Sequence, residues 1–191
     1  FGQSINPNCQ YTLEDLHELY EGSKLMRLEK SYRSTYEIIH FAKKIAGAQD
    51  FQAVERHGEP PLVLAFDEEE RELQKLLELI REFHQSDYNA FGILTRTNPE
   101  AQALYEKLQE LGAEVNLILP ESKAFQNGAT VLSVQMSKGL EFDQVAVPFA
   151  NEGVYHTEFD RNLLYVACTR AMHRLFLTCT GTPTPLLAIS N

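Results

Sequence analysis

An apolar run passes into a polar turn in Thr130-Val131-Leu132-Ser133-Val134-Gln135-Met136-Ser137-Lys138-Gly139-Leu140-Glu141-Phe142. The apolar part is typical of a strand that is buried on both faces of a sheet. Gly139 allows a ligand to approach the backbone closely, and the Glu141 carboxylate can accept hydrogen bonds from a ribose hydroxyl. The same residues also fit a tight turn with a solvated Lys–Glu pair. The stretch therefore predicts a strand followed either by a ligand-binding loop or by a plain turn.

Similar apolar runs recur along the chain and alternate with helical patterns. Runs of Val, Ile, Leu and Phe predict strands over residues 62–66, 91–95, 114–119, 129–134, 144–149 and 174–180. Apolar residues at helical spacing predict helices over residues 13–20, 35–46, 73–83, 101–111 and 159–169. This alternation predicts an α/β fold with a mostly parallel sheet and helices on its faces.

Composition limits the classes of function. A chain of 191 residues that is 43% apolar can form one domain with a sizeable core. Its 17 basic and 27 acidic side chains give a net charge of −10, which argues against a free-standing nucleic-acid binder with a basic face. A domain that contributes a small strip to a shared groove remains compatible with this charge. The acidic block at residues 67–70 is interpreted as a solvated helix N-terminus.

Several kinds of site and location are not indicated. The three cysteines and six histidines show no metal-ligand spacing, so no metal site is expected. No signal-like segment or apolar run of about 20 residues is present, so we expect a cytoplasmic protein without a membrane partner. The P-loop pattern GxxxxGK[ST] is absent, and no Asp-Glu pair ends an apolar strand. We therefore expect that this chain alone does not hydrolyse a nucleotide.

Two further segments carry cations at helix ends. In Lys30-Ser31-Tyr32-Arg33-Ser34-Thr35, Ser34 or Thr35 can cap the helix that follows. Arg33 then lies at a helix N-terminus, where it either pairs with an anion beside a stacking Tyr32 or is simply a surface residue. Arg170 follows the last predicted helix. It either complements the helix dipole or acts as an arginine finger on a γ-phosphate.

Taken together, these segments resemble the C-terminal RecA-like domain of UvrD/Rep-type superfamily 1 helicases. Residues 30–35 resemble motif IV (NYRST) and residues 92–98 resemble motif IVa (LxRTN). Residues 130–142 resemble motif V (TxHxxKGLEF), and residues 163–171 resemble motif VI (LLYVAxTRA). Gln3-Ser4-Ile5 resembles the end of motif III (GDxxQSIY). Five segments in the family's order are far more specific than any one of them.

The resemblance implies a RecA-like three-layer sandwich that lacks its own P-loop. It divides the chain into a lead-in from the preceding domain (residues 1–30), the second RecA-like domain (31–180) and a C-terminal tail (181–191). An N-terminal RecA-like domain would supply the P-loop and would hold Mg²⁺ for the ATP cofactor. Because the sequence starts at Phe1 without an initiator Met, we expect an excised piece that starts inside motif III.

The resemblance also implies residue roles at the phosphate end of ATP. Arg170 would be the catalytic arginine finger that couples hydrolysis to domain closure. Arg33 would be a second catalytic cation and would sense the γ-phosphate together with Gln3.

Other residues would contact the rest of the nucleotide and the nucleic acid. Tyr32 would stack on adenine, and Glu141 would contact the ribose where Gly139 allows close approach. Arg96 would lie along the single-strand channel.

The sequence departs from the family pattern in motif V and in its spacing. Gln135 stands where motif V has His, and Met136 follows where the family has a basic residue. Motifs IV and V lie too close together for the large domain that UvrD and Rep insert there. These features favour the HelD-like branch, whose members act on RNA polymerase.

We therefore expect the C-terminal motor domain of an ATP-dependent DNA helicase or translocase. Its expected partners are the N-terminal RecA-like domain and single-stranded or duplex DNA. Two alternatives remain open: a HelD-like ATPase that remodels RNA polymerase, and a degenerate RecA-like module that only binds a partner protein.

Overall fold

One six-stranded sheet organises the part of the chain that the structure describes. The computed structural model describes residues 30–31, 34–47, 52–53, 56–122 and 127–187. All neighbouring strands of the sheet run parallel, in the order β3-β8-β7-β4-β6-β5. The strands are β3 (Leu62–Phe66), β4 (Ala90–Thr95), β5 (Asn116–Ile118), β6 (Gly128–Ser133), β7 (Phe142–Val147) and β8 (Ala171–Thr180). A separate two-residue pair joins β1 (Lys30–Ser31) to β2 (Gln52–Ala53).

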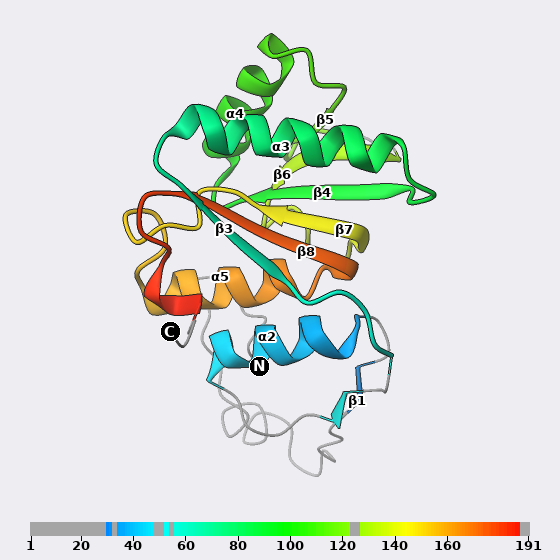
Figure 1. The fold of residues 1–191 in the computed structure, drawn as a ribbon, viewed down its shortest axis with the longest axis vertical. Helices are drawn as coiled ribbons and strands as arrows, with labels where there is room; N and C mark the ends of the chain where they lie inside the picture. Colours follow the sequence, from blue (N-terminus) through cyan, green and yellow to red (C-terminus); the bar gives the residue numbers. More distant parts are fainter. Residues whose placement is uncertain (1–29, 32–33, 48–51, 54–55, 123–126, 188–191) are drawn as a thin grey trace.

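Helices cover both faces of this sheet. Figure 1 shows α3 (Glu69–His84) and α4 (Asn98–Glu110) on one face, and α2 (Tyr36–Ala46) and α5 (Glu158–Cys168) on the other. A short 3₁₀ helix, η1 (Pro185–Leu187), follows β8. The predicted three-layer α/β sandwich is therefore confirmed. Within the described ranges, no helix combines the length and apolar character that a bilayer-spanning segment needs.

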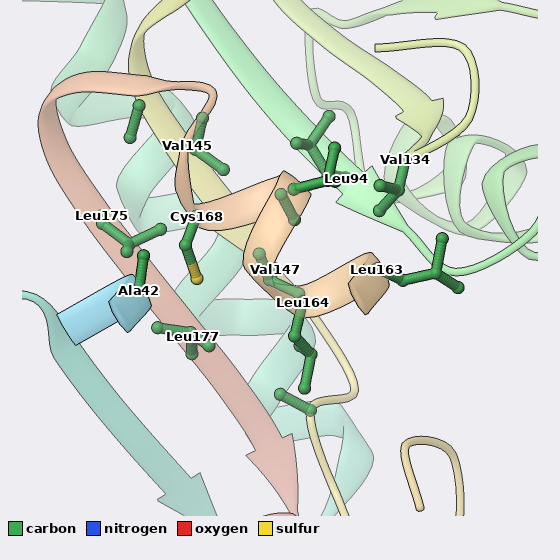
Figure 2. Packing of buried hydrophobic residues seen from close by; sticks show 14 of the residues in the cluster. Ala42, Leu94, Val134, Val145, Val147, Leu163, Leu164, Cys168, Leu175 and Leu177 are labelled. Atoms are coloured by element: carbon green, nitrogen blue, oxygen red, sulfur yellow. The ribbon is translucent and has the colours of Figure 1, made fainter. Parts of the chain in front are cut away.

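The sheet separates two apolar cores. Val145, Val147, Leu175 and Leu177 point toward α2 and α5, where Figure 2 shows them in one cluster with Leu164 and Cys168. The residues between them in β7 and β8 contribute instead to the core under α3 and α4. Because side chains alternate along a strand, both faces of the central strands must be apolar. This requirement explains the unbroken apolar runs in the sequence.

Most predicted elements appear within a few residues of their expected bounds. The largest differences are at the starts of α3, α4 and β8, which lie at Glu69, Asn98 and Ala171 rather than at residues 73, 101 and 174. Strand β7 also begins earlier, at Phe142 rather than at residue 144. Phe142 pairs with Ala171 in the ladder, so both strands start at the same level. The early residues of β8 are only half-buried, and their mixed polarity hides the start of the strand in the sequence. The predicted helix at residues 13–20 lies outside the described residues.

The helix starts follow the sequence only in part. The acidic block at residues 67–70 leads into the exposed first turn of α3, as predicted. Thr35 is the N-cap residue of α2, but its side chain makes no capping hydrogen bond. The Ser34 hydroxyl does not cap the helix either, because it donates to the carbonyl oxygen of Ala171 at 2.5 Å. The predicted side-chain cap of α2 was therefore wrong, and Ser34 instead fixes the helix start to the sheet.

A buried carboxylate joins α3 to the ends of two strands. Glu72 is fully buried, and its carboxylate accepts hydrogen bonds from the Phe149 backbone N–H at 2.8 Å and from the hydroxyls of Thr178 and Thr180, each at 2.7 Å. Phe149 follows β7 with a φ of 57°, an unusual backbone conformation for a bulky residue. The Glu72 hydrogen bond therefore holds the turn at which β7 ends, before the predicted limit at residue 149.

A glycine in β4 makes room for the first residue of β7. A Cβ added at Gly92 would lie 2.8 Å from the ring of Phe142, which is completely buried. Phe142 starts β7 directly after the segment at residues 134–141, so this contact holds the end of that segment on the sheet.

We predict that Gly92→Ala lowers the free energy of unfolding by about 1–3 kcal/mol, because the added methyl group overpacks the core. Urea unfolding would measure this loss. In a Phe142→Leu background the same change should cost less by about 1 kcal/mol, because the smaller side chain leaves room. An equal cost in both backgrounds would contradict the proposed contact.

Candidate functional site

Arg170 lies at the junction of three elements on the amino-terminal edge of the sheet. It lies between Thr169, the C-cap residue of α5, and the first residue of β8, and it is only 5% exposed. Its Nε donates to the carbonyl oxygen of Val166 at 3.4 Å, and one terminal nitrogen donates to the carbonyl oxygen of Leu140 at 3.2 Å. The first contact satisfies a carbonyl in the last turn of α5, so the helix-end explanation applies. The second contact ties this cation to the stretch that precedes β7.

That stretch, residues 134–141, is called the crossing segment below. It leaves the carboxyl end of β6 and reaches the amino end of β7 through consecutive turns. Ser137 is buried and its hydroxyl donates to the Val134 carbonyl oxygen at 2.7 Å. Gly139 has a φ of 86°, and no heavy atom lies within 4 Å of an added Cβ. Gly139 is therefore required by its backbone conformation and faces open space.

The structure brings several predicted site residues to one place. Glu141 is exposed and adjoins Leu140, whose carbonyl oxygen contacts Arg170. Ser34 binds the carbonyl oxygen of Ala171, so the chain just before α2 also reaches this edge. Gly139 and Glu141 flank Leu140, to which Arg170 is hydrogen-bonded, so all three residues lie near the amino ends of β7 and β8. The nucleotide roles of these three residues stay predictions.

Three other predicted nucleotide residues, Gln3, Tyr32 and Arg33, lie outside the described residues. Their roles also stay predictions. Ser34, the residue after Arg33, lies beside Ala171, the residue after Arg170.

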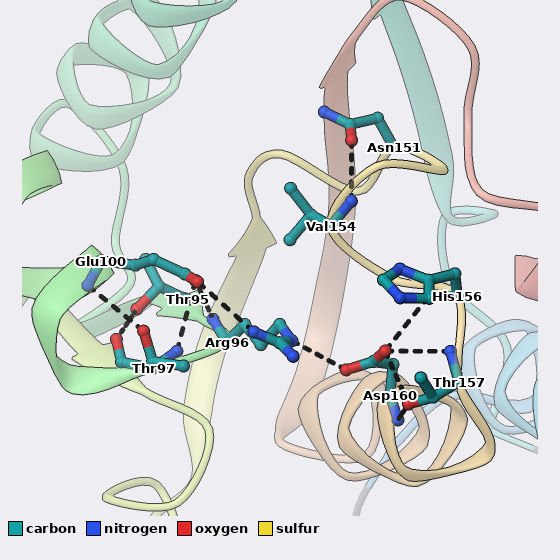
Figure 3. A network of polar contacts seen from close by, with 9 residues as sticks. All are labelled: Thr95, Arg96, Thr97, Glu100, Asn151, Val154, His156, Thr157 and Asp160. Atoms are coloured by element: carbon teal, nitrogen blue, oxygen red, sulfur yellow. Dashed lines mark hydrogen bonds and ion pairs between the residues drawn. The ribbon is translucent and has the colours of Figure 1, made fainter.

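Arg96 lies at the opposite edge of the sheet, just after β4. Its Nε donates to Asp160 Oδ1 at 2.8 Å, and one terminal nitrogen lies 3.8 Å from Glu100 Oε1. The Arg96 side chain is 32% exposed, whereas the Asp160 side chain is 0% exposed. Figure 3 shows the guanidinium held between the two carboxylates. The proposed strand contact of Arg96 stays a prediction, but these ion pairs give the residue a structural task as well.

Both carboxylates also cap the helices that carry them. Thr97 and Glu100 form a capping box at the start of α4, and Thr157 and Asp160 form one at the start of α5. In each box the carboxylate accepts from the N–H of the Thr and of the residue before it, and the Thr hydroxyl accepts from an N–H in the first turn of the helix. The pattern of Thr followed three residues later by Glu or Asp was legible in the sequence. The meeting of both boxes at Arg96 was not, because it depends on the fold.

The environment of Asp160 favours its ionised form. Burial by itself raises the pKa of this carboxyl group, but hydrogen bonds from Arg96, Thr157 and the His156 backbone N–H outweigh burial and lower the pKa to about 2. The same ion pair raises the pKa of the Arg96 guanidinium. The pair is therefore charged across the whole physiological pH range.

A cavity of about 240 Å³ opens beside Arg96. Its lining comes from the residues after β4, from the start of the crossing segment and from the first turns of α5: Arg96, Thr97, Asn98, Pro99, Gln135, Phe159 and Leu163. Ligands of open α/β sheets bind outside the carboxyl ends of the strands, where strand connections diverge. Gln135, which stands where the family motif has His, is part of this lining. Below, the cavity is called the strand-end pocket.

No group of three His, Cys, Asp or Glu side chains in the described ranges could hold a metal ion. Cys168 and Cys179 are buried and unpaired, and burial raises the pKa of the Cys168 thiol to about 12. A thiol with so high a pKa is a poor nucleophile at neutral pH.

Comparisons with known proteins point to one family. Two family models, both described as a UvrD-like helicase C-terminal domain, match residues 26–126 and 128–178. Among solved structures, the chain is 34% identical to the C-terminal domain of a possible DNA helicase from Lactobacillus plantarum WCFS1. That match has a TM-score of 0.71 and covers 84% of this chain and 94% of the other. The predicted RecA-like helicase fold is thereby confirmed.

Other comparisons add less. An arterivirus nonstructural protein 10 helicase, solved with DNA, is 12% identical with a TM-score of 0.44, and the match covers 73% of this chain and 30% of that one. A likeness at that level carries no functional argument. No curated protein sequence matches the chain significantly. The reported matches do not separate a HelD-like branch from other UvrD-like proteins, so that assignment stays a prediction.

We predict that Asp160 contributes a pH-dependent part of the stability. Its pKa falls from about 3.8 in the unfolded chain to about 2 in the folded chain, which corresponds to about 2 kcal/mol. Between these pH values the unfolded chain binds more protons, so this contribution is complete above about pH 4 and is lost as the pH falls toward 2. Urea unfolding of the wild type and of Asp160→Asn should therefore give a difference that is constant above pH 4 and shrinks below it.

Glu158→Gln is the matched control for this measurement. Glu158 lies in the same first turn of α5, but its side chain is 83% exposed. The control should show little difference from the wild type at any pH. A difference between the wild type and Asp160→Asn that stays constant down to pH 2.5 would rule out this origin of the stability.

Proposed function

The chain belongs to the UvrD-like helicase C-terminal domain family, and from this premise we propose that it forms one wall of an ATP site completed by an N-terminal RecA-like domain. A UvrD-like C-terminal domain is a helicase motor domain. The observation that carries the finer proposal is the junction at Arg170. There the Arg170 guanidinium is hydrogen-bonded to the backbone between Gly139, which faces open space, and Glu141, whose side chain is exposed.

The residues at this junction suit the parts of a nucleotide. A guanidinium can stabilise the charge that develops on a transferring γ-phosphoryl group, which is the task of an arginine finger. The Glu141 carboxylate can accept hydrogen bonds from ribose hydroxyls, and Gly139 leaves space for close approach. Mg²⁺ would neutralise phosphate charge from the N-terminal domain. In this chain, the Arg170 contact with Leu140 would make the γ-phosphate and ribose contacts move together.

The strand-end pocket supports the nucleic-acid part of the proposal. Its lining offers the side-chain amides of Asn98 and Gln135 and the ring of Phe159, and single-stranded nucleic acids are held by stacking of their bases on such rings. The net charge of −10 fits a narrow contact strip rather than a broad basic face. We propose single-stranded DNA as the ligand, moved when ATP hydrolysis opens and closes the cleft between the two domains.

The acidic balance and the replacement of the motif V His by Gln135 favour a second candidate. In that case the ATPase would remodel RNA polymerase, and the motor would act on a protein partner. The nucleotide wall would be the same. The two candidates differ in what stimulates ATP turnover.

We predict that Arg170→Ala in the protein that contains both RecA-like domains lowers kcat for ATP hydrolysis by about 10³-fold or more, because the transition-state charge loses its partner. Binding of a fluorescent ATP analogue should change little. Arg81→Ala, on an exposed face of α3, is the control and should leave turnover unchanged. Turnover by Arg170→Ala at the wild-type rate would refute the finger role. Turnover by the 191-residue chain alone would refute the shared site.

We predict that single-stranded DNA stimulates the ATPase of the two-domain protein at least about tenfold, because strand binding favours the closed cleft. Steady-state turnover with and without oligo(dT) measures this effect. If DNA has no effect and the purified protein instead binds RNA polymerase, the remodelling candidate replaces the helicase.

A further inference from the structure

Arg96 joins the first turns of two helices that leave neighbouring strands of the sheet. Its guanidinium contacts Glu100 in the capping box of α4 and Asp160 in the capping box of α5. The two contacts differ in strength. The Asp160 contact is a 2.8 Å hydrogen bond to a fully buried carboxylate, whereas Glu100 lies 3.8 Å away and is 35% exposed. The stronger attachment therefore runs to α5.

Helix α5 connects the strand-end pocket to Arg170. Its first turns supply Phe159 and Leu163 to the pocket lining, and its last turn supplies the Val166 carbonyl oxygen that accepts from Arg170. With 11 residues, α5 spans about 16 Å at 1.5 Å per residue. Its inner face is packed into the core (Figure 2). Displacement of its first turn would therefore move the whole helix, including the end next to Arg170.

The crossing segment provides a second connection between the same two places. Gln135, near its start, lines the pocket, and Leu140, near its end, accepts a hydrogen bond from Arg170. Buried Ser137 fixes the turn between them through its bond to Val134. The pocket and Arg170 thus share two connections, and both contribute residues to the same apolar core.

We infer that Arg96 and Asp160 are positioning residues that fix α5 to the pocket, so that a strand bound there changes the placement of Arg170 and the rate of ATP turnover. This inference rests on the proposed function. It assigns to Arg96 a task other than holding the strand. It also gives a role in turnover to Asp160, which lies ten residues before Arg170 at the other end of the helix.

The buried geometry explains why an ion pair suits this task. Asp160 accepts four hydrogen bonds, three of which come from His156 and Thr157 at the start of α5. Its carboxylate is thus already part of the helix end when Arg96 binds it. Removal of one partner from a buried pair leaves an uncompensated charge, so the pair resists separation. The strand end at Arg96 and the first turn of α5 therefore move as one body.

The test uses the two-domain protein and measures ATP turnover and DNA affinity on the same variants. Asp160→Asn retains an oxygen for the capping bonds and turns an amide toward Arg96, so it breaks the pair while keeping the helix start. Arg96→Ala removes the other partner, and Arg96→Lys restores a cation. Glu100→Gln is the matched control, because Glu100 contacts the same guanidinium from α4, which does not lead to Arg170.

Positioning and strand contact predict opposite results. Under the inference, Asp160→Asn and Arg96→Ala lower the DNA-stimulated kcat about tenfold or more, a loss of about 1.4 kcal/mol in transition-state stabilisation. The Kd for oligo(dT) and its dependence on salt should stay near the wild-type values. Arg96→Lys should recover part of the kcat, and Glu100→Gln should stay within about twofold of the wild type, as expected for an exposed pair.

Three outcomes would overturn the inference. If Arg96→Ala weakens DNA binding and reduces the salt slope by about one while kcat at saturating DNA is retained, Arg96 is a strand contact. If both variants keep wild-type stimulation and affinity, the pair is structural only. If the wild-type ATPase does not respond to DNA at all, the proposed function itself fails, which separates that failure from the first two.

Discussion

All six strands of the sheet run in the same direction, and this constraint determines where the described candidate site residues lie. Each connection between parallel strands must return from the carboxyl edge to the amino edge, and most of these connections are helices. Between β6 and β7 the return is made by the crossing segment alone. For this reason the segment has one end in the strand-end pocket and the other end at Arg170. Helix α5 belongs to the next connection, which returns from the carboxyl end of β7 to the amino end of β8.

The strands were predictable because burial on both faces requires continuous apolar runs. The bounds of β3 agree with the prediction, whereas the start of β8 does not, since Met172, His173 and Arg174 are half-buried and break the apolar pattern. The lead-in helix and the residues Gln3, Tyr32 and Arg33 lie outside the described part of the chain.

The sequence did not predict which carboxylates are buried or what they bind. Glu72 and Asp160 are fully buried carboxylates in a chain whose acidic residues are mostly on the surface. In the composition, both residues count only as two of the 27 acidic side chains that give the net charge of −10. Their partners lie far along the chain, such as Thr178 for Glu72 and Arg96 for Asp160, and only the folded chain brings them together. A capping-box pattern indicates where a carboxylate caps a helix, but not what else it binds.

The contact between Gly92 and Phe142 has an evolutionary consequence. The ring occupies the place of a side chain on β4, so a larger residue at position 92 is acceptable only after position 142 has become smaller. A smaller residue at position 142 alone would leave a hole over the glycine. Either order of substitution passes through a less stable protein, so drift at these two positions should be slow and correlated. A helicase motif that begins a strand can thus be preserved by packing as well as by chemistry.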